Sequence, residues 1–154
     1  MTKQINTKYY LAYGSNLNVE QMAFRCPGAK RVGRTTINNH RLVFRGEPGN
    51  AHASIEVAKG HKVPVMVWAI SMRNEIALDA YEGVPYYYRK EYFPIRVGGK
   101  VHNALVYIMN GKDLEMPSAI YYGTVKRGYK DCGLDYEILE EALNMSTAHY
   151  NHID

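Results

Sequence analysis

Two short segments of the sequence carry groups that suit chemistry on a small polar substrate. The first runs from Tyr10 to Asn16, where an apolar strand turns through Gly14 toward a helix. Such a turn presents free backbone N–H groups at one point, and the helix dipole adds partial positive charge there. The turn can therefore hold a carboxylate or a developing oxyanion. The same pattern is also typical of an ordinary strand-to-helix turn.

The second segment ends in a glutamate beside a helix-terminating glycine. Glu82 stands in the last turn of a predicted helix, and Gly83 follows it. The partial negative charge of the helix end would raise the pKa of the Glu82 carboxyl group, and burial would raise it further. A general base that works near neutral pH needs such a pKa. Asp79, one turn earlier, is the competing carboxylate, and an exposed Glu82 paired with Arg89 or Lys90 is the alternative.

Two further pairs of residues are candidates for binding. The hydroxyl of Tyr121 or Tyr122, early in a later helix, could donate to a substrate, although a tyrosine in the core is the alternative. His149 and His152 have the spacing of metal ligands but no accompanying ligand in the sequence. We interpret both histidines as tail residues and expect neither a metal site nor a cofactor.

Composition narrows the class of protein. The chain has 154 residues, about one domain in length. Its net charge of +4 is spread along the chain, whereas a nucleic-acid binder typically has a denser basic stripe with aromatic platforms. No apolar run approaches the roughly 20 residues that span a bilayer, and the polar start lacks the apolar core of a signal peptide. We therefore expect a cytoplasmic protein that binds neither nucleic acid nor membrane, as a monomer or homodimer. Cys26 and Cys132 are expected to be free thiols.

Alternating and apolar runs predict at least five strands. They are expected at residues 8–13, 31–37, 41–44, 53–57, 63–70, 92–97 and 101–109. Asn38-Asn39 is a plausible hairpin turn between the second and third of these runs. Gly98-Gly99 is expected to join the last two.

Four helices are expected around these strands. Asn16 or Asn18 caps a short helix to about Arg25, and Ser71 opens a helix that ends at Gly83. Pro117 starts a third helix to about residue 129, and Asp135 caps the last. We predict one α+β domain over residues 1–154, whose short, evenly spaced strands suit a curled sheet or a small barrel. Its core covers about residues 8–145, and residues 146–154 form a loose polar tail.

Together these features resemble one enzyme family. The segment Tyr13-Gly14-Ser15-Asn16-Leu17 after an N-terminal strand is similar to the signature loop of the γ-glutamylcyclotransferases. The resemblance extends to Leu78-Asp79-x-x-Glu82-Gly83-Val84, to Tyr88-Arg89 and to Gly133-Leu134, and so covers about residues 8–145. It implies a small mixed β-barrel with helices, and an enzyme that needs no cofactor.

The resemblance also implies a reaction and a set of site residues. A γ-glutamyl amide would cyclise by intramolecular aminolysis to 5-oxoproline and a free amine or amino acid, with Glu82 as the general acid and base. Tyr121, counted back from Gly133, would bind the substrate, with Tyr122 as the neighbouring alternative. The γ-glutamyl group would lie over the loop formed by Tyr10, Leu11, Ala12, Tyr13, Gly14 and Ser15, with Asn16 beside it.

The identity of the leaving amine stays open. The tyrosine-rich stretch of residues 85–88 is a candidate for shaping the pocket around a particular amine. γ-Glutamyl amino acids, γ-glutamylamines and γ-glutamyl-protected natural products are all possible substrates. A catalytically silent module that binds a small ligand or an anion on the same fold is the alternative outside the enzyme class.

Overall fold

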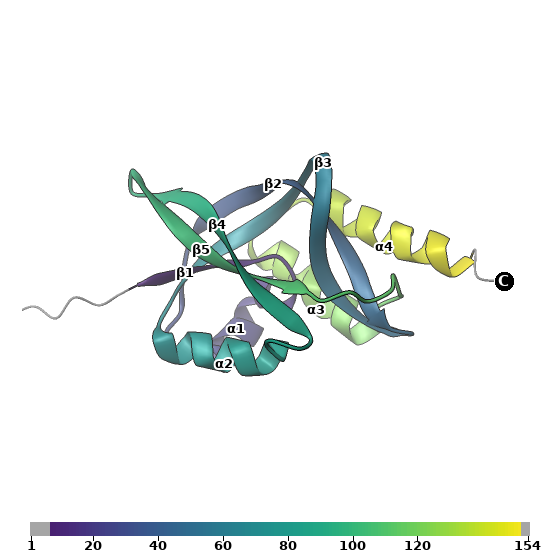
Figure 1. Ribbon diagram of the computed structural model, residues 1–154, viewed down its shortest axis with the longest axis horizontal. Coiled ribbons are helices and arrows are strands. Elements are labelled where there is room, and N and C mark those ends of the chain that lie inside the picture. Colours follow the sequence, from purple (N-terminus) through teal and green to yellow (C-terminus); the bar gives the residue numbers. More distant parts are fainter. Residues whose placement is uncertain (1–6, 152–154) are drawn as a thin grey trace, which may run out of the picture.

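A five-stranded mixed sheet organises the chain, and β1 (Lys8–Ala12) lies at its centre. β1 pairs antiparallel with β3 and parallel with β5, so both neighbours come from later in the chain (Figure 1). The computed structural model describes residues 7–151. The sheet order is β2-β3-β1-β5-β4, in which β2 spans Lys30–Glu47, β3 Asn50–Ile70, β4 Tyr88–Val97 and β5 Lys100–Met109.

The predicted α+β class is confirmed, but the predicted barrel is not closed. β2 and β4 form the two edges of the sheet, and among the described strands they pair with β3 and β5 alone. Figure 1 shows a strongly twisted sheet in which the long β2–β3 pair bends across the molecule and β4–β5 crosses beside it. Closure would require the two edge strands to hydrogen-bond to each other, and they do not.

The expected hairpin turn at Asn38-Asn39 is wrong. β2 runs without a turn through this point, opposite β3. The pairing register shifts by a β-bulge between Asn38 and His40. Asn39 has the positive φ of 57° that asparagine tolerates, and its side-chain Oδ1 accepts a hydrogen bond from the Gly60 N–H at 3.0 Å. The four strands expected over residues 31–70 are therefore two long strands. Their tight turn falls at Pro48-Gly49 instead.

The helix α2 (Met72–Glu82) begins and ends where the sequence predicts. The Ser71 side chain accepts a hydrogen bond from the Asn74 N–H, and the Asn74 side chain accepts one from the Ser71 N–H, which forms a capping box. Gly83 ends the helix in the left-handed conformation, with φ of 66°. This glycine fixes where the chain leaves the helix, and so where Glu82 stands.

The first turn after β1 contains two helical pieces. A short 3-10 helix, η1 (Ser15–Leu17), precedes α1 (Val19–Arg25). Asn18 is the cap of α1, because its side chain accepts a hydrogen bond from the Gln21 N–H at 3.0 Å. Asn16, the other predicted cap, is buried inside η1 instead.

Two more helices complete the fold. α3 (Ala119–Asp131) is capped by Ser118, directly after Pro117, and packs against η1. α4 (Glu137–Asn151) packs against β2, with Leu139, Ala142 and Ser146 buried. α4 continues to Asn151, so the expectation of a loose tail is wrong for residues 146–151; residues 152–154 lie outside the described part.

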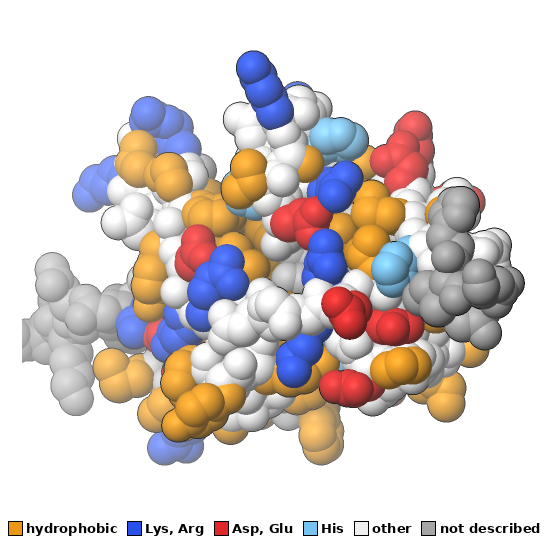
Figure 2. Space-filling view, turned by 45° about the vertical axis from the view of Figure 1, so that its right-hand side comes forward, with side chains coloured by type: hydrophobic (Ala, Val, Ile, Leu, Met, Phe, Trp, Pro, Cys, Tyr) orange, Lys and Arg blue, Asp and Glu red, His pale blue; other side chains and the backbone are white. Residues whose placement is uncertain are grey.

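The surface carries mixed charge. On the face that Figure 2 shows, Lys and Arg side chains lie among Asp and Glu side chains. Glu56 on β3, for example, pairs with both Arg41 and Arg45 on β2, at 2.7 Å each. Within residues 7–151, each helix is too short or too polar to cross a membrane.

Candidate active site

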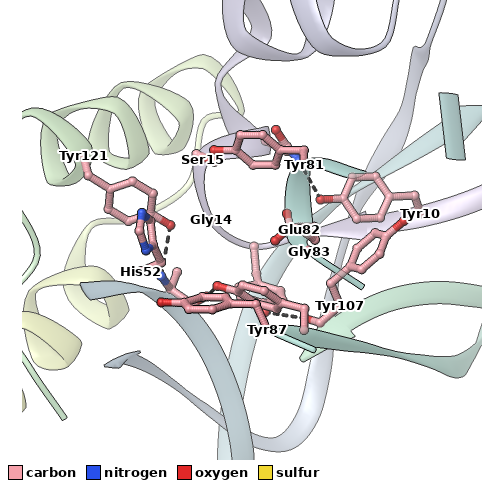
Figure 3. A pocket seen from close by; sticks show the side chains of 14 residues that line it. Tyr10, Gly14, Ser15, His52, Tyr81, Glu82, Gly83, Tyr87, Tyr107 and Tyr121 are labelled. Carbon is pink, nitrogen blue, oxygen red and sulfur yellow. Dashed lines mark hydrogen bonds between the residues drawn. The ribbon is translucent and has the colours of Figure 1, made fainter. Parts of the chain in front are cut away.

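A cavity of about 250 Å³ opens where the loop after β1, the end of α2 and the start of α3 meet inner strands of the sheet. Figure 3 shows Glu82 between Tyr121 and His52 on one side and Tyr10 and Tyr107 on the other. The cavity is lined by Tyr10, Tyr13, Gly14, Ser15, Asn16, His52, Ala53, Tyr81, Glu82, Gly83, Tyr87, Tyr88, Tyr107 and Tyr121.

The turn after β1 brings backbone close to the cavity. A Cβ atom on Gly14 would lie 3.1 Å from the Ala53 Cβ and 3.4 Å from the Tyr121 hydroxyl, so any other residue would crowd both neighbours. The N–H groups of Ser15 and Asn16 stand in the first turn of η1, where no earlier carbonyl of that helix can accept from them. The turn therefore offers two backbone donors at the edge of the cavity.

Asn16 ties this turn to three other elements. Its side-chain amide N–H donates to the Tyr10 hydroxyl at 3.0 Å, and its Oδ1 accepts from Arg25 of α1. Its backbone carbonyl accepts from the Trp68 indole N–H at 3.1 Å. Because all three bonds are buried or partly buried, the turn is held rigidly rather than free to move.

Glu82 is the one carboxylate that lines the cavity among the described residues. It is partly buried, and its carboxylate accepts no hydrogen bond from any residue within 7–151. Burial raises the pKa of Glu82 to about 7, while the positive charge of Arg25 opposes that rise. A carboxyl group with this pKa can both accept and return a proton at neutral pH.

Asp79, the competing carboxylate, is already engaged. Its Oδ2 pairs with the Lys90 Nζ at 2.8 Å, and its Oδ1 accepts from the Tyr107 hydroxyl at 2.6 Å. Asp79 is also absent from the residues that line the cavity. Its geometry suits the positioning of Tyr107, a cavity residue, better than proton transfer to a ligand.

Two tyrosine hydroxyls keep their protons available. The Tyr121 hydroxyl accepts from the Ala53 N–H at 3.0 Å, and the Tyr10 hydroxyl accepts from Asn16. Neither hydroxyl donates to a described residue, so each has an O–H to offer to a ligand. By contrast, Tyr88 donates to the Ala53 carbonyl and Tyr13 to the Tyr107 carbonyl.

The electrostatics of the cavity keep these hydroxyls neutral. Burial raises the pKa of Tyr10, Tyr13, Tyr88 and Tyr121, and the negative charge of Glu82 raises each further. The tyrosines therefore act as hydrogen-bond donors and not as bases.

The structure brings most of the predicted site residues together and separates a few. Tyr10, Tyr13, Gly14, Ser15, Asn16, Glu82 and Tyr121 all line the cavity. Leu11 and Ala12 are buried in β1 and belong to the core. Tyr122 is half-buried against Phe44 and is not among the lining residues, so of the two candidate tyrosines the cavity meets Tyr121.

His52 and Tyr107 are cavity residues that the sequence reasoning missed. Each lies inside a strand, on β3 or β5, where a single polar or aromatic residue carries no motif. Tyr87 and Tyr88 lie in the tyrosine-rich stretch that the sequence marks as a candidate for shaping the pocket.

Of the two tail histidines, His149 lies near the end of α4 and His152 lies outside the described residues. Over residues 7–151, no group of three His, Cys, Asp or Glu side chains is arranged to hold a metal ion.

Comparison with known proteins gives the family. The sequence model of the family described as Gamma-glutamyl cyclotransferase, AIG2-like matches residues 10–127. The γ-glutamylcyclotransferase of Bos taurus is 30% identical over 140 residues, which cover 83% of this chain and 73% of that protein. The enzyme of Homo sapiens is 29% identical over 141 residues, covering 86% and 75%.

A solved structure agrees with the sequence relatives. A γ-glutamyl cyclotransferase superposes with a TM-score of 0.78 at 27% identity, covering 89% of this chain and 86% of that one. The mixed sheet with its flanking helices is thus the fold of a small γ-glutamyl cyclotransferase-like α+β protein. The chain belongs to the γ-glutamyl cyclotransferase, AIG2-like family.

Proposed function

We propose that this protein is a γ-glutamylcyclotransferase in which Glu82 transfers the protons of the reaction. The observation that carries the proposal is the state of Glu82. Its carboxyl group is partly buried, has a pKa of about 7, faces a cavity and has no hydrogen-bond partner within residues 7–151. The substrate would be a γ-glutamyl amide, and the products would be 5-oxoproline and a free amine.

The proposed reaction begins with the substrate's own α-ammonium group. Glu82 removes one proton from it, and the freed amine attacks the γ-carbonyl carbon to form the new C–N bond of a five-membered ring. The tetrahedral centre then collapses as the original amide C–N bond breaks. Glu82 returns its proton to the departing nitrogen. The attacking nitrogen loses its second proton, which the released amine takes up to depart as an ammonium ion, so the ring nitrogen keeps one proton, the carboxylate is regenerated and no other reactant is consumed.

The donors around the cavity would hold the negative charges of the substrate. The Ser15 and Asn16 N–H groups, together with the hydroxyls of Tyr10 and Tyr121, suit the α-carboxylate and the oxyanion that forms on the γ-carbonyl oxygen. One such donor typically contributes about 2.7–4 kcal/mol to the transition state. Intramolecular attack in a held geometry can contribute about 7–11 kcal/mol. A rigid turn, two hydroxyls and one carboxyl group therefore suffice for the chemistry.

We place the reaction in the cytosol. Cys26 and Cys132 are buried and unbonded to each other, and free thiols are the normal state of cysteine in a reducing compartment.

A paired assay tests the proposal through the nucleophile. One γ-glutamyl amide is compared with its N-acetyl derivative, and both amine release and the second product are followed. Acetylation delocalises the lone pair of the α-nitrogen, so ring closure should stop and the derivative should release no amine. Free glutamate as the first product, or equal release from the acetylated compound, would point to hydrolysis by water or by an enzyme nucleophile.

A further inference from the structure

The α-ammonium group of the substrate brings more hydrogen-bond donors to the cavity than the proposed proton transfer uses. It carries three N–H groups, and Glu82 takes a proton from one of them at a time. The remaining N–H groups lose their water when the substrate is bound, and a buried donor without a partner is costly. A cavity built for this substrate therefore needs hydrogen-bond acceptors near Glu82.

One residue of β3 decides which tyrosine hydroxyls can serve as acceptors. The Ala53 N–H donates to the Tyr121 hydroxyl at 3.0 Å (Figure 3), and the Ala53 carbonyl accepts from the Tyr88 hydroxyl at 2.7 Å. The first bond leaves Tyr121 its proton to donate. The second bond uses the one proton of Tyr88, so the Tyr88 oxygen can only accept from a ligand. The two phenols thus present opposite hydrogen-bonding character.

The Tyr88 oxygen is free to accept such a bond. Tyr88 is buried and lines the cavity, and its oxygen receives no hydrogen bond from the part of the chain that the structure describes. The negative charge of Glu82 helps to raise the pKa of Tyr88, which places this hydroxyl within electrostatic reach of the Glu82 carboxyl group. Burial raises the same pKa, so the phenol stays neutral and accepts a hydrogen bond without taking the proton.

Tyr13 is the other candidate acceptor, and it is less free. Its hydroxyl donates to the Tyr107 carbonyl, and the charge of Glu82 raises its pKa too. The Ser54 side chain, however, hydrogen-bonds to the Tyr13 hydroxyl and lowers that pKa. The Tyr13 oxygen thus already has a protein partner, which leaves Tyr88 as the better acceptor for a ligand.

The two bonds to Ala53 match the two charges on the α-carbon of a γ-glutamyl compound. In an extended strand the N–H and the carbonyl of one residue point to the same side, so the hydroxyls of Tyr121 and Tyr88 lie near each other, and each affects the electrostatics of the other's site. The α-carboxylate of the substrate needs donors, which Tyr121 and the Gly14 turn supply. The α-ammonium on the same carbon needs acceptors, which Tyr88 and Glu82 supply.

We propose that Tyr88 is a substrate-binding residue whose oxygen accepts a hydrogen bond from the α-ammonium group, and that the Ala53 carbonyl fixes this polarity. The inference rests on the proposed function and assigns the part of the same site that recognises the substrate's cation.

A substrate and its analogue without the amino group test the inference. γ-Glutamyl-alanine and γ-glutamyl-butylamine are screened for 5-oxoproline release, and the faster one is paired with its glutaryl counterpart, which lacks the α-amine and serves as a competitive inhibitor. Tyr88→Phe keeps the buried ring and removes the oxygen. We expect KM for the substrate to rise at least about tenfold, as for a hydrogen bond to a charged group, while Ki for the glutaryl compound changes less than about twofold.

Tyr121→Phe is the matched control. It removes the hydroxyl that suits the α-carboxylate, which both compounds carry, so KM and Ki should rise by similar factors. Neither constant depends on the fraction of protein that is folded, so a loss of active enzyme cannot imitate the selective effect of Tyr88→Phe. An equal rise of KM and Ki in Tyr88→Phe, or a change in neither, would overturn the inference and leave the proposed function standing. Release of 5-oxoproline from neither amide by the wild-type protein would overturn both.

Discussion

Glu82 combines three local features that rarely occur in one carboxyl group. It ends α2, it borders a cavity, and it has no hydrogen-bonding partner within residues 7–151. Asp79, three residues earlier on the same helix, has two partners, Lys90 and Tyr107. The difference arises because the two side chains leave the helix in different directions, one toward the β4–β5 pair and the other into the cavity.

Replacing Glu82 by glutamine should remove catalysis without disturbing the fold. Gln keeps the size of the side chain but cannot carry protons, so we expect Glu82→Gln to lose at least about 10²-fold in kcat. Asp79→Asn should lose far less. Above pH 7 the variant should be at least as stable as the wild type, because burial raises the Glu82 pKa and so the ionised carboxylate destabilises the folded state. Near-normal turnover in a folded Gln variant would assign the base elsewhere.

The acid limb of the pH profile should report the pKa of Glu82. Because the base must be ionised, kcat/KM should rise with pH and level off above about pH 7. The positive charge of Arg25 lowers that pKa, so Arg25→Gln should raise it and move the acid limb to higher pH.

Arg25→Lys serves as the control for this shift. It keeps the charge near Glu82, so its acid limb should stay close to that of the wild type. If Arg25→Gln moved the limb to lower pH, or both variants moved it equally, charge at this position would not be the cause.

At the scale of elements, α3 presents two neighbouring tyrosines to different surroundings. Tyr121 meets the cavity and bonds to Ala53 on β3, whereas Tyr122 packs on Phe44 and lies near Glu140. A helix turns by about 100° per residue, so adjacent side chains necessarily face different neighbours.

Removing the two hydroxyls in turn should therefore have unequal effects. Tyr121→Phe removes a donor from the cavity and leaves the Ala53 N–H unpaired. We expect KM to rise by about two- to tenfold, because the loss of one hydrogen bond typically costs about 0.5–1.5 kcal/mol. Tyr122→Phe should change KM much less. The opposite order would make Tyr122 the residue that contacts the substrate.

One buried carboxylate of α2 pairs with two strands of the sheet. Glu75 accepts from Lys8 of β1 and from Lys90 of β4, at 2.6 Å each, while Lys90 also pairs with Asp79. Burial alone would raise the pKa of Glu75, but the hydrogen bonds from the two lysines hold it below its ordinary value. These ion pairs fix the helix that ends at Glu82.

Breaking this anchor should cost stability in a pH-dependent way. Glu75→Gln loses both ion pairs, so we expect the free energy of unfolding to fall by about 1.5–3 kcal/mol at pH 7. The Glu75 pKa is lower in the folded state than in the unfolded chain. The ionised carboxylate therefore adds to the free energy of unfolding at a pH above its ordinary pKa, and this contribution is lost as the pH falls through the pKa of the folded state. The free energy of unfolding should be measured by urea titration at pH 7 and at pH 3. It should differ strongly between wild type and variant at pH 7 and little at pH 3. Glu141→Gln, an exposed glutamate on α4, is the control and should be neutral at both pH values.

At the scale of the whole molecule, the two thiols report on the core. Cys26 lies fully buried after α1, and the Cys132 thiol, at the end of α3, donates to the Leu17 carbonyl of η1 at 3.3 Å. Burial raises the pKa of Cys26 to about 11 and also raises that of Cys132. Both thiols are thus protonated as well as inaccessible in the folded protein.

Thiol labelling should consequently follow unfolding. A thiol reagent should react with neither cysteine at neutral pH in the native protein, and with two thiols per chain in urea. A reducing agent should leave the melting temperature unchanged. Rapid labelling of one thiol in the native state would mean that η1 or the end of α3 opens locally.

Local interactions allowed the sequence to predict the ends of α2, the turn at Gly98-Gly99 and the candidate roles of Glu82 and the Gly14 turn. A cap such as Ser71 or Gly83 interacts with residues only a few positions away, so a short stretch of sequence is enough to predict it. The family resemblance drew on the same short segments. The glutamate at a helix end and the glycine at a strand end could be recognised before any strand was paired.

The tertiary structure decided everything that depends on a distant partner. The conformation of Asn39 suits either a hairpin turn or a β-bulge. The structure has the bulge, because β3 continues opposite β2 on both sides of this residue. Residues 146–151 look polar, yet they continue α4, in which Ser146 is buried. His52 and Tyr107 reach the cavity because their strands lie beside the loop after β1, more than 35 residues away in sequence. Strand pairing and burial join segments that no local pattern connects, and the cavity is assembled from such segments.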